Sequence, residues 1–394
     1  MTRVLLLTFY YPPDLSAGSF RASALADALL RVGGPDVTLD VITSTPNRYG
    51  SFNQHASAVE LQGNLSIYRV QVPLHHSGML GQARSFYRFA RSARLLAHGR
   101  SYDIVVATSS RLFTAWLGRR IAVQHKSKLV LDIRDIFVES IRDVLGPYKS
   151  VWLVPVLRVL ERTTFASADE IVIVSPGFVD YVHERYAGVP HTVCTNGVDD
   201  EFASFPAVQR DGEATSEKLI LYAGNVGAGQ ALDEILPDAA AALAGKVRFL
   251  VVGDGGRRVR LERELRARRL ENVDIRNPVK REELKELYMR ADALLLHVGE
   301  LPAFARVLPS KIFEYAATGK PIIAGVGVTA ARFLRDNVSS TYFFKQGQSR
   351  SLTEAVNTMD WSIADRSAFV KKFLRRDLMK KLALQILARQ RRVT

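Results

Sequence analysis

Short apolar runs alternate with helical segments along the chain, and this alternation restricts the fold more than any other feature. In the first half we expect buried strands over Val4–Thr8, Val37–Thr43, 65–72, Ile104–Ala107, Leu129–Ile133 and Ile171–Val174. Between them we expect helices over Phe20 to Val32, 82–99, 111–125 and 150–166. Continuous apolar strands joined by helices are typical of a parallel sheet covered on both faces. The first half therefore predicts a doubly wound α/β sheet.

The same alternation begins again after a polar, turn-rich stretch at 203–218. Here we expect strands over Leu219–Tyr222, Val247–Val252, Val273–Arg276, Ala293–His297 and Ile322–Ala324. A chain of 394 residues is also too long for one ordinary hydrophobic core. We therefore expect a first domain over 1–200, a second over 201–365, and a basic helix over 366–394 that packs back on the first domain.

Charge and cysteine content narrow the classes of function. The chain has 54 lysines and arginines against 40 acidic residues, a net charge of +14, which favours an anionic partner such as nucleic acid, lipid or a phosphorylated substrate. Its single cysteine, Cys194, excludes a disulfide framework and a cysteine zinc cluster. No apolar run approaches the ~20 residues that span a bilayer. We expect a cytoplasmic protein.

Residues 305–325 carry the clearest chemical pattern, because they combine a loop, a short helix and a buried strand. Pro309 is placed as a first helical residue, where its missing N–H costs nothing. Ser310, Lys311 and the free N–H groups of the helix start favour an anion. Glu314 lies one turn further on the same side. This spacing suits the diphosphate and ribose of a sugar nucleotide, although a capped helix with a surface lysine and glutamate has the same spacing.

Glycines and charged residues also follow several of the expected strands. Gly18 precedes the first helix, Gly224 and Asn225 open the turn after 219–222, and Gly253–Gly255 follow the next strand. Ligands of open parallel sheets bind at the carboxyl ends of strands, and glycine lets the backbone approach them.

Charged residues stand at similar positions in the first half. Asp132-Ile-Arg-Asp135 ends a strand, where its side chains form a local ion pair or line a cleft, and we favour the cleft. Arg21 adds a positive charge to the first turn of its helix.

Two basic segments suit an anionic membrane surface. One face of the helix over 82–99 carries Arg84, Arg88, Arg91 and Arg94. Met79 and Leu80 form an apolar loop tip before that helix, beside His75 and His76. The C-terminal segment combines helical apolar spacing with Lys371, Lys372, Arg375, Arg376, Lys380, Lys381, Arg389, Arg391 and Arg392. Basic amphipathic helices bind anionic lipid, but solvated surface arginines give the same pattern.

The chain resembles, over its whole length, the family 4 retaining glycosyltransferases of the GT-B fold. It is most similar to their WbuB-like branch of bacterial surface-polysaccharide enzymes. Four parts of the sequence, taken together in their order and spacing, carry this resemblance. They are Phe9–Pro13 with Ala17–Arg21, Val130–Asp135 with Glu139–Ser140, Tyr222–Asn225 with Val252–Gly255, and Leu308–Pro321. The resemblance implies two Rossmann-like domains facing across a cleft. A nucleotide-sugar donor would bind mainly to the C-terminal domain and an acceptor to the N-terminal domain.

The resemblance also implies roles for single residues. Glu314 would hold the ribose, the segments after 247–252 and 273–276 would flank the nucleoside, and Gly18 would line the diphosphate or acceptor side. The residues expected at the donor are Glu314, Ser310, Gly18, Gly224, Asn225, Gly253, Asp254, Gly255, Pro278 and Val279.

The chain departs from the family pattern at two places. Arg306 stands where relatives have a first glutamate, eight residues before Glu314. Asn225 and Gln230 replace the arginine and lysine that grip the diphosphate in many relatives. Our hypothesis is that Arg306 and Lys311 supply this charge instead.

The expected reaction follows from these residues and the resemblance. Fixed cations stabilise a leaving diphosphate, and Asp135 or Arg134 is expected to orient the acceptor. We expect no metal, because no Asp-x-Asp pair ends a strand in the second half. The donor would be a UDP-sugar, and an N-acetylated or deoxy sugar would fit the loss of the first glutamate. The acceptor would be a lipid-diphosphate sugar or a glycan, met at the inner face of the plasma membrane.

Two other classes of function share features with this sequence. A nucleotide-sugar epimerase shares the two-domain fold and stays an alternative. A nucleic-acid-binding protein is disfavoured, because aromatic and basic residues do not interleave on any strand.

Overall fold

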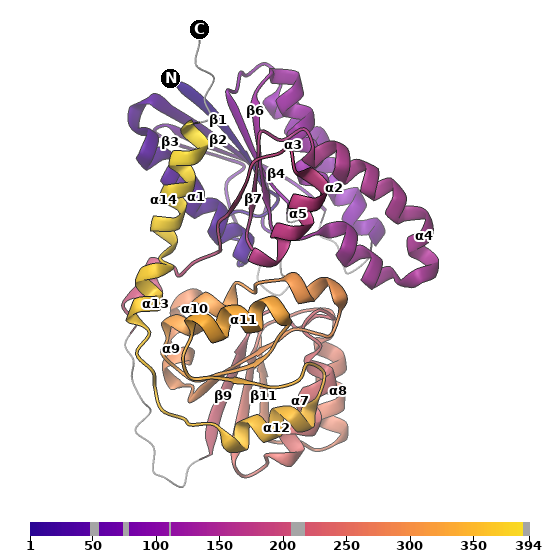
Figure 1. The fold of residues 1–394 in the computed structure, drawn as a ribbon, viewed down its shortest axis with the longest axis vertical. Coiled ribbons are helices and arrows are strands. Elements are labelled where there is room, and N and C mark those ends of the chain that lie inside the picture. The colour runs from indigo at the N-terminus through magenta and orange to yellow at the C-terminus, as the bar shows by residue number, and fades with distance from the viewer. Residues whose placement is uncertain (48–54, 74–78, 110–111, 206–216, 389–394) are drawn as a thin grey trace. The chain divides into compact units, whose positions relative to one another are not determined.

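The computed structural model of the protein describes residues 1–47, 55–73, 79–109, 112–205 and 217–388, with the backbone alone at 79–80 and 143–150. The chain divides into two compact units (Figure 1). The first comprises Met1–Asn196 with Arg375–Thr394, and the second comprises Gly197–Leu374. His75, His76, Arg389, Arg391, Arg392 and most of the polar stretch at 203–218 lie outside the described residues.

The first unit is built on an eight-stranded sheet with the order β3-β4-β2-β1-β5-β6-β7-β8. The strands are β1 (Thr2–Leu7), β2 (Val37–Ser44), β3 (Val59–Gln62), β4 (Leu65–Val70), β5 (Ile104–Thr108), β6 (Lys128–Ile133), β7 (Glu170–Ile173) and β8 (His191–Val193). All neighbours pair in parallel except β3, which forms an antiparallel edge with β4. The sequence did not predict β3, because the strand has only four residues, of which two are polar and three are exposed.

The helices of the first unit are α1 (Ala17–Gly33), α2 (Met79–Ala97), α3 (Leu112–His125), α4 (Phe137–Phe165), α5 (Val179–Tyr186) and α14 (Arg375–Ala388). The last helix, α14, lies beside α1 (Figure 1). Met379, Leu382 and Ile386 of α14 belong to the same buried cluster as Leu25 and Leu29 of α1. The basic C-terminal helix therefore has its apolar face in the core of the first unit.

Three helix starts differ from the sequence predictions. Helix α1 begins at Ala17, because the Ser16 side chain caps it by accepting from the Ser19 N–H. Helix α2 begins at Met79, so the expected apolar loop tip is its first turn. Helix α4 begins at Phe137 instead of 150 and runs through the Gly-Pro pair that favours a break. Buried residues on both sides of that pair, Val138 and Leu157, explain why it continues.

The second unit contains a six-stranded parallel sheet with the order β11-β10-β9-β12-β13-β14. Its strands are β9 (Lys218–Ala223), β10 (Val247–Val252), β11 (Val273–Arg276), β12 (Ala293–His297), β13 (Ile322–Gly325) and β14 (Thr341–Phe343). Its helices are α6 (Asp200–Ala203), α7 (Leu232–Ala242), α8 (Arg258–Ala267), α9 (Arg281–Arg290), α10 (Lys311–Ala317), α11 (Val328–Asn337), α12 (Ser349–Thr358) and α13 (Ser367–Lys372). Successive residues of β9 enter opposite cores: Leu221 belongs to one buried cluster, and Ile220 and Tyr222 to the other.

The predicted fold class is confirmed, because each unit is a doubly wound parallel sheet with helices on both faces. In each sheet the first strand of the unit is flanked by strands that lead in opposite directions: β1 lies between β2 and β5, and β9 between β10 and β12. Ligands of such sheets bind outside the carboxyl ends of the strands at this switch point. None of the helices in the described ranges is long and apolar enough to cross a membrane.

Candidate functional site

Two backbone turns meet at the carboxyl ends of β9 and β10. The Gly224 N–H donates to the Val252 carbonyl, and the Val226 N–H donates to the Asp254 carbonyl, both at 2.9 Å. A Cβ atom at Gly253 would collide with the Gly224 carbonyl oxygen, so only glycine lets the two turns pack this closely. The structure thus brings together Gly224, Gly253 and Asp254, all predicted site residues.

Asn225 and Gln230, which replace the expected arginine and lysine, face each other across the same turn. Their side-chain amides hydrogen-bond at 2.6 Å. The Gln230 carbonyl accepts from Nδ1 of His297 (2.7 Å), while Nε2 of His297 accepts from the Gly347 N–H (3.2 Å). Burial lowers the pKa of His297, which favours this neutral form. Sequence reasoning did not single out His297, whose role here is to fix the turn.

Arg258 connects the turn after β10 to the segment after β11. Its Nη1 donates to the Gly253 carbonyl (3.1 Å) and to Oδ1 of Asn277 (2.6 Å). Pro278 and Val279, which follow Asn277, are half-buried. Two segments predicted to flank a nucleoside are therefore joined by one guanidinium.

Helix α10 is shorter than the sequence predicted and starts at Lys311, with Ser310 as its N-cap. The expected first residue, Pro309, lies outside the helix. The entry is a tight turn in which the Ile312 N–H donates to the Pro309 carbonyl and the Phe313 N–H to the Ser310 carbonyl, both at 3.2 Å.

Glu314 is held by three side chains and has only 6% of its surface exposed. Its Oε2 accepts from Oη of Tyr288 (3.1 Å) and from Nζ of Lys311 (2.9 Å). Nη1 of Arg281 lies 4.0 Å from Oε1 of Glu314. Nη2 of the same guanidinium pairs with Asp199 at 2.7 Å. Lys311 and Glu314, the predicted diphosphate and ribose residues, are thus in direct contact.

The residue after Glu314 fixes α10 against the sheet. The Tyr315 hydroxyl accepts from the Ala223 N–H at the end of β9 (3.0 Å), and its ring packs edge-on against Tyr288. Burial raises the pKa of Tyr288 well above its ordinary value, so its hydroxyl stays a donor to Glu314. Glu314 and the Gly224 turn are therefore tied to the same strand end. Tyr288 and Arg281 carried no local sequence signal.

Arg306 ends the 3₁₀ helix η3 (Pro302–Arg306) and is half-buried. The ring of Phe304 in η3 lies against Gly229, close enough that a Cβ there would approach it to 3.1 Å. The segment that carries Arg306 is therefore packed on the turn after β9.

In the first unit, Gly18 makes room for a guanidinium. A Cβ atom at Gly18 would collide with Nη1 of Arg134, which follows β6. The start of α1 and the end of β6 are thus in contact. Gly18 was predicted to face a ligand, and the structure shows that its immediate neighbour is Arg134.

Arg21 and Asp132 form a buried ion pair, each with 1% of its side chain exposed. The Asp132 carboxylate accepts from Nη2 and Nε of Arg21 at 2.7 and 2.9 Å, and Nη1 donates to the Thr195 carbonyl. Burial by itself lowers the pKa of Arg21, but Asp132 raises it above its ordinary value. The interpretation of Asp132 as a cleft-lining residue is therefore wrong, because Asp132 and Arg21 satisfy each other inside the unit.

Asp135 lies between β6 and α4, where its Oδ1 accepts from the Ser140 hydroxyl at 2.9 Å. Burial raises its pKa, and the Ser140 hydrogen bond opposes this effect. The structure thus brings together two residues of one predicted motif. The role of Asp135 toward an acceptor stays a prediction.

Two sequence families match the chain. A family described as "Glycosyl transferase 4-like domain" matches residues 16–197, and one described as "Glycosyl transferases group 1" matches residues 217–359. The chain is also similar to the putative colanic acid biosynthesis glycosyl transferase WcaI of Escherichia coli strain K12, with 25% identity over 228 residues. That match covers 55% of this chain and 56% of WcaI, so the chain spans little more than half the length of this curated relative.

Solved structures with the same fold include three informative proteins. Sucrose-phosphate synthase from Thermosynechococcus elongatus superposes with a TM-score of 0.70 at 16% identity, over 99% of both chains. The glycosyltransferase WaaG, involved in lipopolysaccharide biosynthesis, gives 0.67 at 16% identity, over 98% of this chain and 99% of WaaG. HepE of Anabaena, in complex with UDP and glucose, gives 0.65 at 15%, over 98% of this chain and all of HepE. The predicted GT-B fold is confirmed, while the WbuB-like branch stays a prediction.

Proposed function

We propose the following function from the premise that this chain belongs to the family 4 glycosyltransferases of the GT-B fold. The protein transfers a sugar from a UDP-sugar to a lipid-linked or glycan acceptor, with retention of the anomeric configuration. One observation carries the proposal: the buried Glu314, held by Tyr288 beside the switch point of the second unit. A carboxylate fixed there accepts from the two hydroxyls of a ribose.

The donor site would work by fixed charge. Lys311 contacts Glu314 through an oxygen that Tyr288 also contacts, so the carboxylate stays positioned when Lys311 turns to a diphosphate. Arg306 ends η3, whose Phe304 packs against the turn after β9. Two cations beside the leaving group stabilise the charge that develops on it, without rearrangement of the site. They would take the place of the pair replaced by Asn225 and Gln230.

The choice of a UDP-sugar is supported by the fold shared with HepE, whose structures contain UDP and UDP-glucose. The transferred sugar would be a hexose or an N-acetylhexosamine, or a deoxy sugar, because Arg306 replaces the glutamate expected to contact sugar hydroxyls. No metal is proposed in this step.

The acceptor would be a lipid-diphosphate sugar or glycan of bacterial surface-polysaccharide synthesis. This part is supported by the likeness to WcaI, named for colanic acid biosynthesis, and by the shared fold of WaaG. The exposed arginines of α2 suit a peripheral position on the inner face of the plasma membrane. Asp135, whose pKa is raised by burial, would orient the acceptor hydroxyl.

A thermal-shift panel tests the donor class. At a concentration of 100 times its Kd, a ligand stabilises the folded protein by about 2.7 kcal/mol, which corresponds to roughly 5–10 °C in a domain of this size. We expect this shift with UDP and one UDP-sugar, and none with GDP or ADP. The absence of a shift with every nucleotide would contradict the proposal. Conversion of the UDP-sugar in the absence of any acceptor would indicate a nucleotide-sugar epimerase instead.

A further inference from the structure

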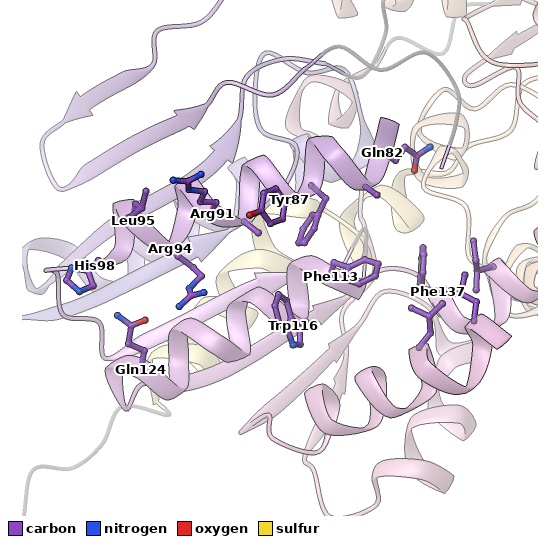
Figure 2. Close-up of a pocket in the computed structure, with 16 residues that line it drawn as sticks. Gln82, Tyr87, Arg91, Arg94, Leu95, His98, Phe113, Trp116, Gln124 and Phe137 are labelled. Carbon is purple, nitrogen blue, oxygen red and sulfur yellow. The ribbon is translucent and has the colours of Figure 1, made fainter. Parts of the chain in front are cut away.

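An apolar groove of about 660 Å³ lies in the first unit, between α2, α3 and α4 (Figure 2). Its walls include Phe86 of α2, Phe113 and Trp116 of α3, and Phe137, Leu153 and Leu157 of α4. The described residues that line it include no carboxylate. It lies in the first unit, whereas Glu314 and Lys311 lie in the second.

Small side chains on α2 keep the groove open. Ala83 and Ala90 line it and are seven residues apart, which places them two turns apart on one helix face. Protein interiors are normally close-packed, so an unfilled space of this size between aromatic walls indicates room for a ligand. Its aromatic and aliphatic walls suit an apolar chain rather than a polar molecule.

The rim of the groove is positive. Arg91 and Arg94 line it from α2, as Figure 2 shows, and both are exposed. Within the described parts of the chain, neither guanidinium lies within ion-pairing distance of a carboxylate. Arg84 and Arg88 are exposed on the same helix but do not line the groove. An occupant therefore needs an apolar chain with a negative group at one end.

Helix α4 continues the apolar surface to the outside. Trp152 is 85% exposed, and Val156 and Val159 follow on the same face of the helix, also exposed. The neighbouring residue Leu153 lines the groove. An exposed tryptophan at the end of an apolar stripe suits the level of lipid headgroups. A soluble partner protein would also cover such a stripe, but the unpaired arginines favour phosphate.

We propose that this groove holds an acyl chain of an anionic bilayer phospholipid, whose phosphate binds Arg91 and Arg94. The volume suits one acyl chain, whereas the longer polyprenyl chain of a lipid-linked acceptor would extend beyond it. The proposal rests on the membrane position within the proposed function, and it is independent of the donor site. Lipid bound here would hold the first unit at the bilayer surface.

Tryptophan fluorescence tests occupancy directly. The chain has three tryptophans, so Trp152→Phe with Trp361→Phe leaves Trp116 in the groove wall as the only reporter. The probe is a vesicle of phosphatidylglycerol with brominated acyl chains. We expect strong quenching of Trp116, and little quenching by brominated phosphatidylcholine vesicles at equal salt. No quenching, or equal quenching by both lipids, would overturn the proposal.

A matched pair of double variants separates the groove from general surface charge. Arg91→Gln with Arg94→Gln and Arg84→Gln with Arg88→Gln each remove two charges from α2. If only bulk attraction to anionic lipid mattered, both double variants would lose the same affinity for vesicles. We expect Arg91→Gln with Arg94→Gln to lose about tenfold more affinity than the other pair, because its phosphate contacts are lost as well. Equal losses would overturn the proposal.

A third variant fills the space without changing charge. Ala83 is exposed at the groove wall, so Ala83→Phe is expected to fold and to abolish quenching of Trp116. The UDP-induced thermal shift is measured on the same proteins. Loss of quenching with an intact UDP shift supports the groove. Unchanged quenching of Trp116 in this variant would overturn the lipid-binding proposal. The absence of a UDP-induced shift in every protein would contradict the donor site alone.

Discussion

Loss of the Asp132 carboxylate is expected to destabilise the first unit strongly. The substitution Asp132→Asn keeps the size of the side chain but leaves the Arg21 guanidinium buried without the carboxylate that neutralises its charge. Removing one partner of a buried ion pair typically costs about 3–5 kcal/mol, because an uncompensated charge remains. With both side chains 1% exposed, solvent screening does not reduce this cost.

The assay is urea denaturation of the chain with Trp152→Phe and Trp361→Phe, followed by the fluorescence of Trp116 in the first unit. A matched control is Asp27→Asn, which breaks the exposed Arg31–Asp27 pair of α1 and is expected to cost less than about 1 kcal/mol. The double variant Arg21→Met with Asp132→Leu removes both charges and is expected to recover most of the loss. A cost for Asp132→Asn no greater than that of the Asp27 control would refute the reasoning.

Three further predictions concern single residues of the two units. Gly253→Ala forces a methyl group into the carbonyl of the neighbouring turn and is expected to cost roughly 2–4 kcal/mol in thermal melts, whereas Gly256→Ala has open space and is expected to be neutral. Asp135→Asn is expected to stabilise the protein more at pH 8 than at pH 4, because burial raises the pKa of Asp135 and its charged form opposes folding above that pKa. Lys311→Gln is expected to lower kcat by about 10²–10³-fold, while the exposed Lys345→Gln keeps full activity.

Each of these predictions has an outcome that contradicts it. Equal melting temperatures for the two glycine variants would mean that the turns after β9 and β10 separate easily. A pH-independent effect of Asp135→Asn would mean that the carboxyl is not shifted. Full activity and donor affinity of the Lys311 variant would contradict the hypothesis that Arg306 and Lys311 supply the diphosphate charge.

The strands were predictable because parallel strands buried on both faces are continuous apolar runs. The bounds of β10 and β12 are those that the sequence predicted, Val247–Val252 and Ala293–His297. The start of α4 was not predictable, because the Gly-Pro pair inside it favours a break. The burial of Val138 and Leu157 on either side of the pair outweighs that preference. The edge strand β3 has only four residues, Val59–Gln62, and its two apolar residues make too short a pattern to detect.

The candidate site was predictable only where a motif is local in sequence. Glu314 and Gly253 stand in such motifs: Gly253 directly follows β10, and Glu314 lies on α10, which Tyr315 connects to the end of β9. Tyr288 holds Glu314 from 26 residues away and reads in the sequence as an ordinary core residue. The Arg21–Asp132 pair is separated by 111 residues, so no spacing rule connects the two.

Titration of the protein with UDP by isothermal calorimetry tests the central claim most directly. The wild type is expected to bind UDP, and Glu314→Gln is expected to bind about 10–100-fold more weakly, because charge-assisted hydrogen bonds to the ribose are lost. Glu283→Gln, an exposed control on α9, is expected to bind like the wild type. Equal UDP affinity in the wild type and a folded Glu314→Gln variant, or no binding by the wild type, would contradict a donor site built around Glu314.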